Sequence, residues 1–337
     1  MARPFLTVLT APVPGARQRL IQDLRRRARR IVKPGVPVPA VSPYPGHYAL
    51  VRSVVEGLRA IGADFNFNPR RLRDVARIVY APANEALLQA AALKRDGRID
   101  YLVAGPVNAL LVDECDGILR TPEIDLLIVA HEWATGLLSD APLRAKSRAC
   151  PCGVDTEVWK PTGAARSGIA LVYWKSGDQA FCEQVEQIVR ACGLEPRRVR
   201  SLHGEHSLFS PADYRALLDQ SAIGVFLSAF ETQGLALAEA WSMDVPTMVW
   251  DPRGVAYWRG RPFESQSSAP YLTPATGRTW RTLGELEPVL RAALADRSVF
   301  RPREWMLTNM TDAICARRLL GIIGEAARAA SPSETPC

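Results

Sequence analysis

Two glutamates with seven residues between them, Glu231 and Glu239, lie in a stretch that could bind a polar ligand. The pattern around them predicts a strand over 223–227, a helix over 235–243 and a second strand over 247–250. Short apolar runs on either side of a helix are typical of buried parallel strands, and such sheets bind ligands at the carboxyl ends of their strands. A carboxylate at the start of the helix and another two turns along suit the hydroxyl groups of a sugar and a nucleotide.

The neighbours of the two glutamates make this pattern more specific. Gly234 lets the backbone approach a ligand closely where the helix begins. Together with Ser228 and Ala240, the pair resembles the donor-binding motif of retaining GT-B glycosyltransferases, glycosyltransferase family 4 in particular.

A second resemblance marks a domain boundary. Residues 153–161, GVDTEVWKP, resemble the interdomain signature of that family, with Trp159 in place of the usual phenylalanine. The resemblance implies an α/β protein of the GT-B fold, in which two Rossmann-like, doubly wound domains face a cleft. We expect an acceptor-side domain over 1–147, on which a last helix over 311–330 packs back, and a nucleotide-sugar donor-binding domain over 148–310.

The resemblance also implies roles for the residues of the donor site. Glu231 would bind sugar hydroxyls, and Glu239 the ribose hydroxyls. The family places an arginine and a lysine after the first strand of the second domain, where they neutralise the donor diphosphate. Only Lys175 stands there in register, so Arg253 or Arg259 is a guess for the second cation. The candidate catalytic residues are Glu231 and Lys175, and the candidate donor-binding residues are Thr232, Gln233, Gly234, Leu235, Glu239 and, in a loop expected to cradle the nucleobase, His203 and Gly204.

Four residues of the first domain are candidates for the acceptor side of the cleft. Gly46 and His47 open a predicted long helix, where the family has a glycine-rich turn. Asn108 lies in a turn after a predicted strand, at the edge where ligands bind. His131 follows another predicted strand, and either contacts substrate or serves the start of the next helix.

The positive charge of the chain is concentrated in one segment. The net charge of the chain is +7. Arg17–Lys33 contains eight basic residues and one acidic residue, so this segment alone has a net charge of +7. Its apolar residues recur at helical spacing, so the segment is predicted to be a basic amphipathic helix. It either lies on an anionic membrane surface near a lipid-linked acceptor, or packs on its own domain with solvated arginines. Because the rest of the chain is close to neutral, we expect no nucleic-acid partner.

The composition fits a soluble protein of two domains, since 337 residues can form two cores. The seven cysteines are scattered and no signal peptide is recognised, which suggests reduced thiols in the cytoplasm, with a possible peripheral position on the inner face of the membrane. We expect no cofactor and no metal ion, because no cysteine or histidine pairs have the spacing of a zinc site.

The expected function is therefore the transfer of a sugar from a nucleotide-sugar to an acceptor with retention of configuration, in bacterial-type surface polysaccharide or glycoconjugate synthesis. The reaction would need neither a metal ion nor a covalent intermediate. Two alternatives stay open: a nucleotide-sugar epimerase or hydrolase of the same fold, and a non-catalytic subunit of a membrane assembly.

Overall fold

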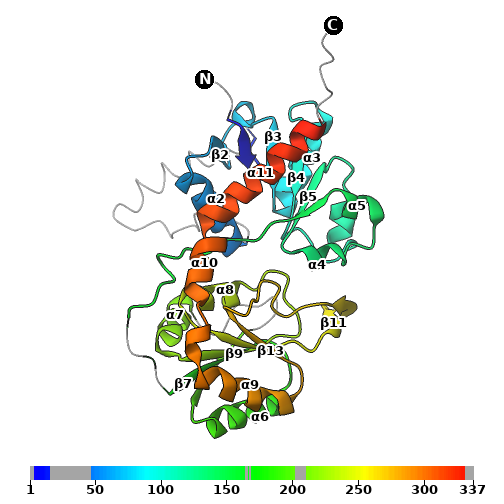
Figure 1. The fold of residues 1–337 in the computed structure, drawn as a ribbon. Coiled ribbons are helices and arrows are strands. Elements are labelled where there is room, and N and C mark those ends of the chain that lie inside the picture. Colours follow the sequence, from blue (N-terminus) through cyan, green and yellow to red (C-terminus); the bar gives the residue numbers. More distant parts are fainter. Residues whose placement is uncertain (1–3, 16–46, 164–165, 167, 202–209, 331–337) are drawn as a thin grey trace, which may run out of the picture. The chain divides into compact units, whose positions relative to one another are not determined.

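The computed structural model describes residues 4–15, 47–163, 166, 168–201 and 210–330. The chain divides into two compact units, each with its own sheet (Figure 1). Unit 1 comprises Met1–Cys150 and Cys315–Cys337, and unit 2 comprises Pro151–Ile314. The predicted basic helix over Arg17–Lys33 lies outside the described residues.

Unit 1 is built on a parallel sheet of strand order β2-β1-β3-β4-β5-β6. Its strands are β1 (Leu6–Val8), β2 (Phe65–Phe67), β3 (Ile78–Ala81), β4 (Tyr101–Ala104), β5 (Leu126–Val129) and β6 (Ser147–Ala149). Its helices are α2 (Tyr48–Ala60), α3 (Asn84–Arg95), α4 (Glu132–Thr135), α5 (Ala141–Ala145) and α11 (Asp312–Ala330), with 3₁₀ turns η1 (Leu72–Asp74) and η2 (Cys115–Arg120). Apolar residues of α2 and α11 cover one face of the sheet, and those of α3, α4 and α5 belong to the core of the other face.

Unit 2 has a second parallel sheet, of order β13-β10-β9-β7-β8. Its strands are β7 (Ile169–Trp174), β8 (Glu195–Arg200), β9 (Ile223–Leu227), β10 (Thr247–Trp250) and β13 (Gly277–Trp280). Its helices are α6 (Gln179–Ala191), α7 (Pro211–Gln220), α8 (Leu235–Ser242), α9 (Leu283–Ala295) and α10 (Pro302–Asn309), with a 3₁₀ turn η3 (Arg297–Val299). Helices α6 and α9 cover one face, and α7 and α8 lie on the other (Figure 1). Two parallel sheets, each covered on both faces, confirm the predicted α/β class with two doubly wound units.

Unit 2 also contains a β-hairpin that was not predicted from the sequence. The arginine- and aromatic-rich segment forms β11 (Gly254–Trp258) and β12 (Arg261–Ser265), which pair antiparallel. The two turn residues, Arg259 and Gly260, both have positive φ, at 50° and 77°. Positive φ at both turn residues is typical of the type I′ turn, whose twist matches that of the two flanking strands.

The segment that begins unit 2, Pro151–Trp159, is called the linker segment below. It runs against the segment that ends the unit, because Val154 forms an isolated bridge with Thr311 and its N–H donates to Met310 O at 3.1 Å. Gly153 is required there, since a Cβ at this position would lie 2.6 Å from Asp312 Cα. The two ends of unit 2 therefore meet at one place.

Among the described residues, no helix has both the length and the apolar character of a membrane span.

The pairing of β13 with β10 depends on Gly277, because a Cβ there would lie 2.0 Å from the carbonyl oxygen of Thr247. We expect Gly277→Ala to force the two strands apart and to lower the free energy of unfolding by about 2–3 kcal/mol, measured by denaturant unfolding. Gly284→Ala is the control, because nothing lies within 4 Å of the added methyl group. It should change stability by less than about 1 kcal/mol, and equal effects of the two variants would contradict the close strand packing.

Candidate functional site

An ion pair lies at the carboxyl edge of the unit 2 sheet. Lys175 directly follows β7, and Glu231 follows the neighbouring strand β9. Lys175 Nζ lies 2.6 Å from Glu231 Oε1, and the two side chains are only 18% and 16% exposed. The backbone holds this geometry, because the N–H groups of Lys175 and Ser176 both donate to Leu227 O at 2.9 Å. The structure thus brings together the two residues predicted to be catalytic.

Glu231 is held at both its carboxylate and its backbone. The buried Ser228 hydroxyl lies 3.1 Å from Glu231 Oε1 and 2.8 Å from Phe230 O. The Glu231 N–H donates to Ser267 O at 3.1 Å. Phe230 is buried and meets the ring of Phe263 in the hairpin edge to face, with centroids 4.8 Å apart. The hairpin, which the sequence did not predict, therefore supports the residue next to Glu231.

Helix α8 begins at a glycine that leaves its first amides uncapped by a side chain. Gly234 has φ 70° and ψ 50°, the left-handed conformation that glycine adopts without strain. As the N-cap residue it has no side chain to accept a hydrogen bond from the N–H of Ala236 or Leu237. Uncapped N–H groups and the helix dipole favour an anion at this position.

Two buried tyrosines lie within the electrostatic field of the glutamates. Burial is the main cause that raises the pKa of Tyr173 well above its usual range; a hydrogen bond with Ser201 opposes this shift, and the negative charges of Glu231 and Glu239 add to it. Burial is also the main cause of the raised pKa of Tyr214, with the charge of Glu239 next, and the Tyr214 hydroxyl donates to Ala236 O at 2.8 Å. Both phenols therefore stay neutral, and Tyr214 ties α7 to the first turn of α8.

Tyr173 was missed by the sequence reasoning, although a signal existed. It stands two residues before Lys175 in β7, and side chains two apart in a strand point to the same face. The ring of Tyr173 stacks on Phe226 at 5.1 Å and meets Tyr214 at 5.8 Å, on the face that α7 and α8 cover.

The other predicted donor residues divide into three groups. Thr232 and Leu235 lie in the loop and first turn of α8, beside Gly234. The side chain of Gln233 hydrogen-bonds to the backbone of Cys152 in the linker segment. His203 and Gly204, together with Gly46 from the acceptor set, lie outside the described residues.

The remaining acceptor candidates have local structural partners or lie exposed. Asn108 is buried, where its Oδ1 accepts from Gly105 N at 2.6 Å and its Nδ2 donates to Asn84 Oδ1 at 3.0 Å. His131 Nδ1 accepts from Trp133 N at 3.2 Å and so caps α4, which is the helix-start role that the sequence suggested as one alternative. His47 is exposed at the residue before α2.

The two arginines suggested as a second cation have partners near the hairpin. Arg253 Nε lies 3.1 Å from Asp251 Oδ2, and the Arg259 guanidinium lies over the Trp258 ring at 5.4 Å. Within the described part of the chain, no group of three or more histidine, cysteine, aspartate or glutamate side chains is placed to hold a metal ion.

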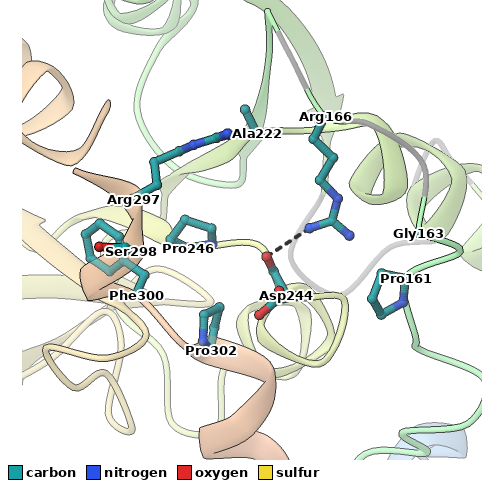
Figure 2. A pocket seen from close by; sticks show the side chains of 10 residues that line it. All are labelled: Pro161, Gly163, Arg166, Ala222, Asp244, Pro246, Arg297, Ser298, Phe300 and Pro302. Carbon is teal, nitrogen blue, oxygen red and sulfur yellow. Dashed lines mark hydrogen bonds between the residues drawn. The ribbon is translucent and has the colours of Figure 1, made fainter. Parts of the chain in front are cut away.

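A separate cavity of about 510 Å³ lies at the other edge of the same sheet (Figure 2). Its lining residues Ala222 and Pro246 stand just before β9 and β10, at the amino ends of these strands. Arg166 lies in it and donates to the backbone oxygens of Asp244 at 2.9 Å, Met243 at 2.6 Å and Asp219 at 3.2 Å. These bonds satisfy carbonyls at the ends of α7 and α8, so Arg166 serves the fold.

Solved structures share this architecture. The lipopolysaccharide outer core galactosyltransferase WaaB, in its apo form, matches with a TM-score of 0.52 and 10% identity over 95% of this chain and 98% of its own. Sucrose-phosphate synthase from Thermosynechococcus elongatus matches with a TM-score of 0.50 and 12% identity over 98% and 100%. The catalytic domain of starch synthase IV from Arabidopsis thaliana, bound to ADP and acarbose, matches with a TM-score of 0.51 and 9% identity over 85% and 79%.

The chain therefore has the GT-B fold of glycosyltransferases, as predicted. No family model and no curated protein matches the sequence. At such low identity the likeness extends to the fold alone.

The Lys175–Glu231 pair can be tested without any ligand. We expect Lys175→Met and Glu231→Gln each to lower the free energy of unfolding by about 1–3 kcal/mol, since each leaves a half-buried partner without its counter-charge. The double variant should lose less than the sum, with a coupling energy of about 1 kcal/mol or more in a double-mutant cycle. The exposed pair Lys160–Glu157, at 3.0 Å, is the matched control and should show almost no coupling. Strictly additive losses at 175 and 231 would contradict the pair.

Proposed function

We propose that this protein is a glycosyltransferase that moves a sugar from a nucleotide-sugar donor to an acceptor with retention of configuration and without a metal ion. One observation carries the proposal. In a GT-B fold, the Lys175–Glu231 pair lies at the carboxyl edge of the unit 2 sheet, beside the uncapped start of α8. Cations, amides and carboxylates at that edge match the charges and hydroxyls of a nucleotide-sugar.

The donor diphosphate would bind between Lys175 and the first amides of α8. A lysine ammonium has three donors, so Lys175 can contact phosphate oxygens and keep its bond to Glu231. The amides at Gly234 and Leu235 add partial positive charge without a desolvated cation. The nucleobase would be held near His203 and Gly204, and Thr232, in the loop between β9 and α8, would line the donor site.

The glutamates would divide the recognition of hydroxyl groups. Glu231 follows β9 and contacts Lys175, the cation proposed to hold the diphosphate, so its carboxylate would accept from the sugar hydroxyls. Glu239 lies farther along α8 and would accept from the ribose hydroxyls. The oxygens of both carboxylates can accept hydrogen bonds from such hydroxyl groups.

The reaction would be driven by electrostatic stabilisation of the leaving group. The bond between the anomeric carbon and the phosphate oxygen breaks, and a bond from the acceptor hydroxyl oxygen to that carbon forms on the same face. The acceptor proton passes to the departing phosphate oxygen, so no separate base is required. Lys175 and the α8 amides stabilise the charge that develops on the diphosphate.

The acceptor would be a sugar or a lipid-linked sugar in surface polysaccharide or glycoconjugate synthesis. His47 is exposed before α2 and stays the described candidate for the acceptor side, whereas Asn108 and His131 support backbone turns. The basic segment Arg17–Lys33 would place the protein at the cytoplasmic face of an anionic membrane.

The nucleotide can be identified by a thermal-shift panel of UDP, GDP, dTDP, ADP and CMP, followed by the corresponding nucleotide-sugars. We expect one nucleoside diphosphate to raise the melting temperature by mass action, with about 2.7 kcal/mol of stabilisation at a hundred times its Kd. The shift should persist in excess EDTA, because Lys175 and backbone amides would neutralise the phosphates. A shift abolished by EDTA would contradict metal independence, and no shift from any diphosphate would contradict donor binding.

Transfer can then be measured with the identified nucleotide-sugar. Lys175→Ala and Glu239→Ala should each lower the rate on the order of 10²-fold or more, while circular dichroism shows that the fold persists. Lys160→Ala and Glu183→Ala, exposed residues of the same unit, are matched controls that should keep wild-type rates. Near-wild-type transfer by either site variant would show that the site is misassigned. Release of free sugar or of an isomerised donor without acceptor would favour the hydrolase or epimerase alternative.

A further inference from the structure

Gln233 joins the proposed donor loop to the linker segment through both polar atoms of its amide. Its Oε1 accepts from Cys152 N at 2.9 Å, and its Nε2 donates to Cys152 O at 3.2 Å. The two residues are 81 positions apart in the chain, and Cys152 is buried. The side chain thus pairs with the backbone as a neighbouring strand would.

The linker segment is also held at the far end of α8. Ser242, the last residue of that helix, donates its hydroxyl to Trp159 O at 2.5 Å. Arg303 donates to Trp159 O at 3.1 Å, to Ser242 O at 2.6 Å and to Thr156 O at 3.2 Å. The linker segment therefore binds α8 at both ends, with Gln233 as the contact at the amino end.

The position of the linker segment is itself fixed. Gly153 lies against the backbone of Asp312 too closely for any Cβ, and Val154 N–H donates to Met310 O. Gln233 is thus attached to a rigid part of unit 2.

We propose that Gln233 is a positioning residue for the donor diphosphate. This inference rests on the proposed function. Gln233 directly precedes Gly234 and stands two residues after Glu231, so its bonds to Cys152 fix the loop between the carboxylate and the first amides of α8. A loop that is ordered before binding loses less conformational entropy when the ligand arrives, which strengthens affinity.

This role differs from the direct donor contact that the motif suggested. A residue that only touches the donor leaves the ligand-free loop unchanged when it is replaced. A positioning residue changes the loop before any ligand is present, and amide hydrogen exchange of the ligand-free protein reports that change.

The test replaces Gln233 by methionine, which has similar length and lacks both hydrogen-bonding groups. In ligand-free Gln233→Met we expect faster amide exchange in peptides covering 151–155 and 230–236. The Kd for the nucleoside diphosphate found in the thermal-shift panel should rise about tenfold by calorimetry, which corresponds to about 1.4 kcal/mol.

Unit 1 contains a matched control. Gln89 makes the same pair of bonds to a backbone, with Val13 N donating to its Oε1 at 2.6 Å and its Nε2 donating to Val13 O at 3.1 Å. Gln89→Met removes the same two bonds in the other unit, between helix α3 and the segment at Val13. It should leave the nucleotide Kd and the exchange of 230–236 unchanged.

A second variant covers the case in which Gln233→Met does not fold. Ser242→Ala removes the contact at the other end of α8 and should weaken nucleotide binding in the same direction, by about threefold. If Gln233→Met binds nucleotide and exchanges its amides like the wild-type protein, the role of Gln233 is refuted while the proposed function stands. If only Ser242→Ala folds, the same result in that variant has the same meaning. Failure of the wild-type protein to bind any nucleoside diphosphate would overturn the proposed function itself, and with it any donor role for Gln233.

Discussion

The half-buried ion pair between Lys175 and Glu231 is the constraint around which unit 2 is arranged. Removing two charges from water is costly unless each finds a partner in good geometry. The fold provides that geometry through two adjacent parallel strands, because β7 ends at Lys175 and β9 leads to Glu231. The hydrogen bonds from Lys175 and Ser176 to Leu227 hold these strand ends together. In the proposed donor site, the cation would thus be in place before any phosphate group binds.

Helix α8, which follows Glu231 in the chain, is held to its neighbouring elements by side-chain hydrogen bonds. Tyr214 holds its first turn from α7, and the indole of Trp241 donates to Thr247 Oγ1 at the start of β10. The amino end of the helix has no side-chain cap, because its N-cap residue is Gly234. Helix α8 is thus held by contacts to α7 and β10, while its first N–H groups have no side-chain cap from Gly234.

The hydrophobic pattern of the sequence predicted the strands and the helix that carry the candidate site. The expected elements over 223–227, 235–243 and 247–250 correspond to β9, α8 and β10 within one residue, because their apolar runs, glycine and proline act over short distances. The partner of Gln233 depends on a contact between distant parts of the chain, which no spacing rule encodes. The hairpin was missed because its strands are only five residues long and arginines stand at their ends, which is also typical of a loop. His131 could be either a ligand or a cap in the sequence, and only the position of the Trp133 amide favours the cap.

The meeting of Val154 with Thr311 has a consequence for how this architecture can change. The chain enters and leaves unit 2 at neighbouring points, so unit 2 is arranged like a domain inserted into unit 1. Closely spaced ends allow a folded unit to be exchanged without rethreading the one that carries it. A recombination event at the Gly153–Asp312 contact would therefore exchange the whole parallel sheet of unit 2, including its carboxyl edge. The sheet of unit 1 would keep its own strand order.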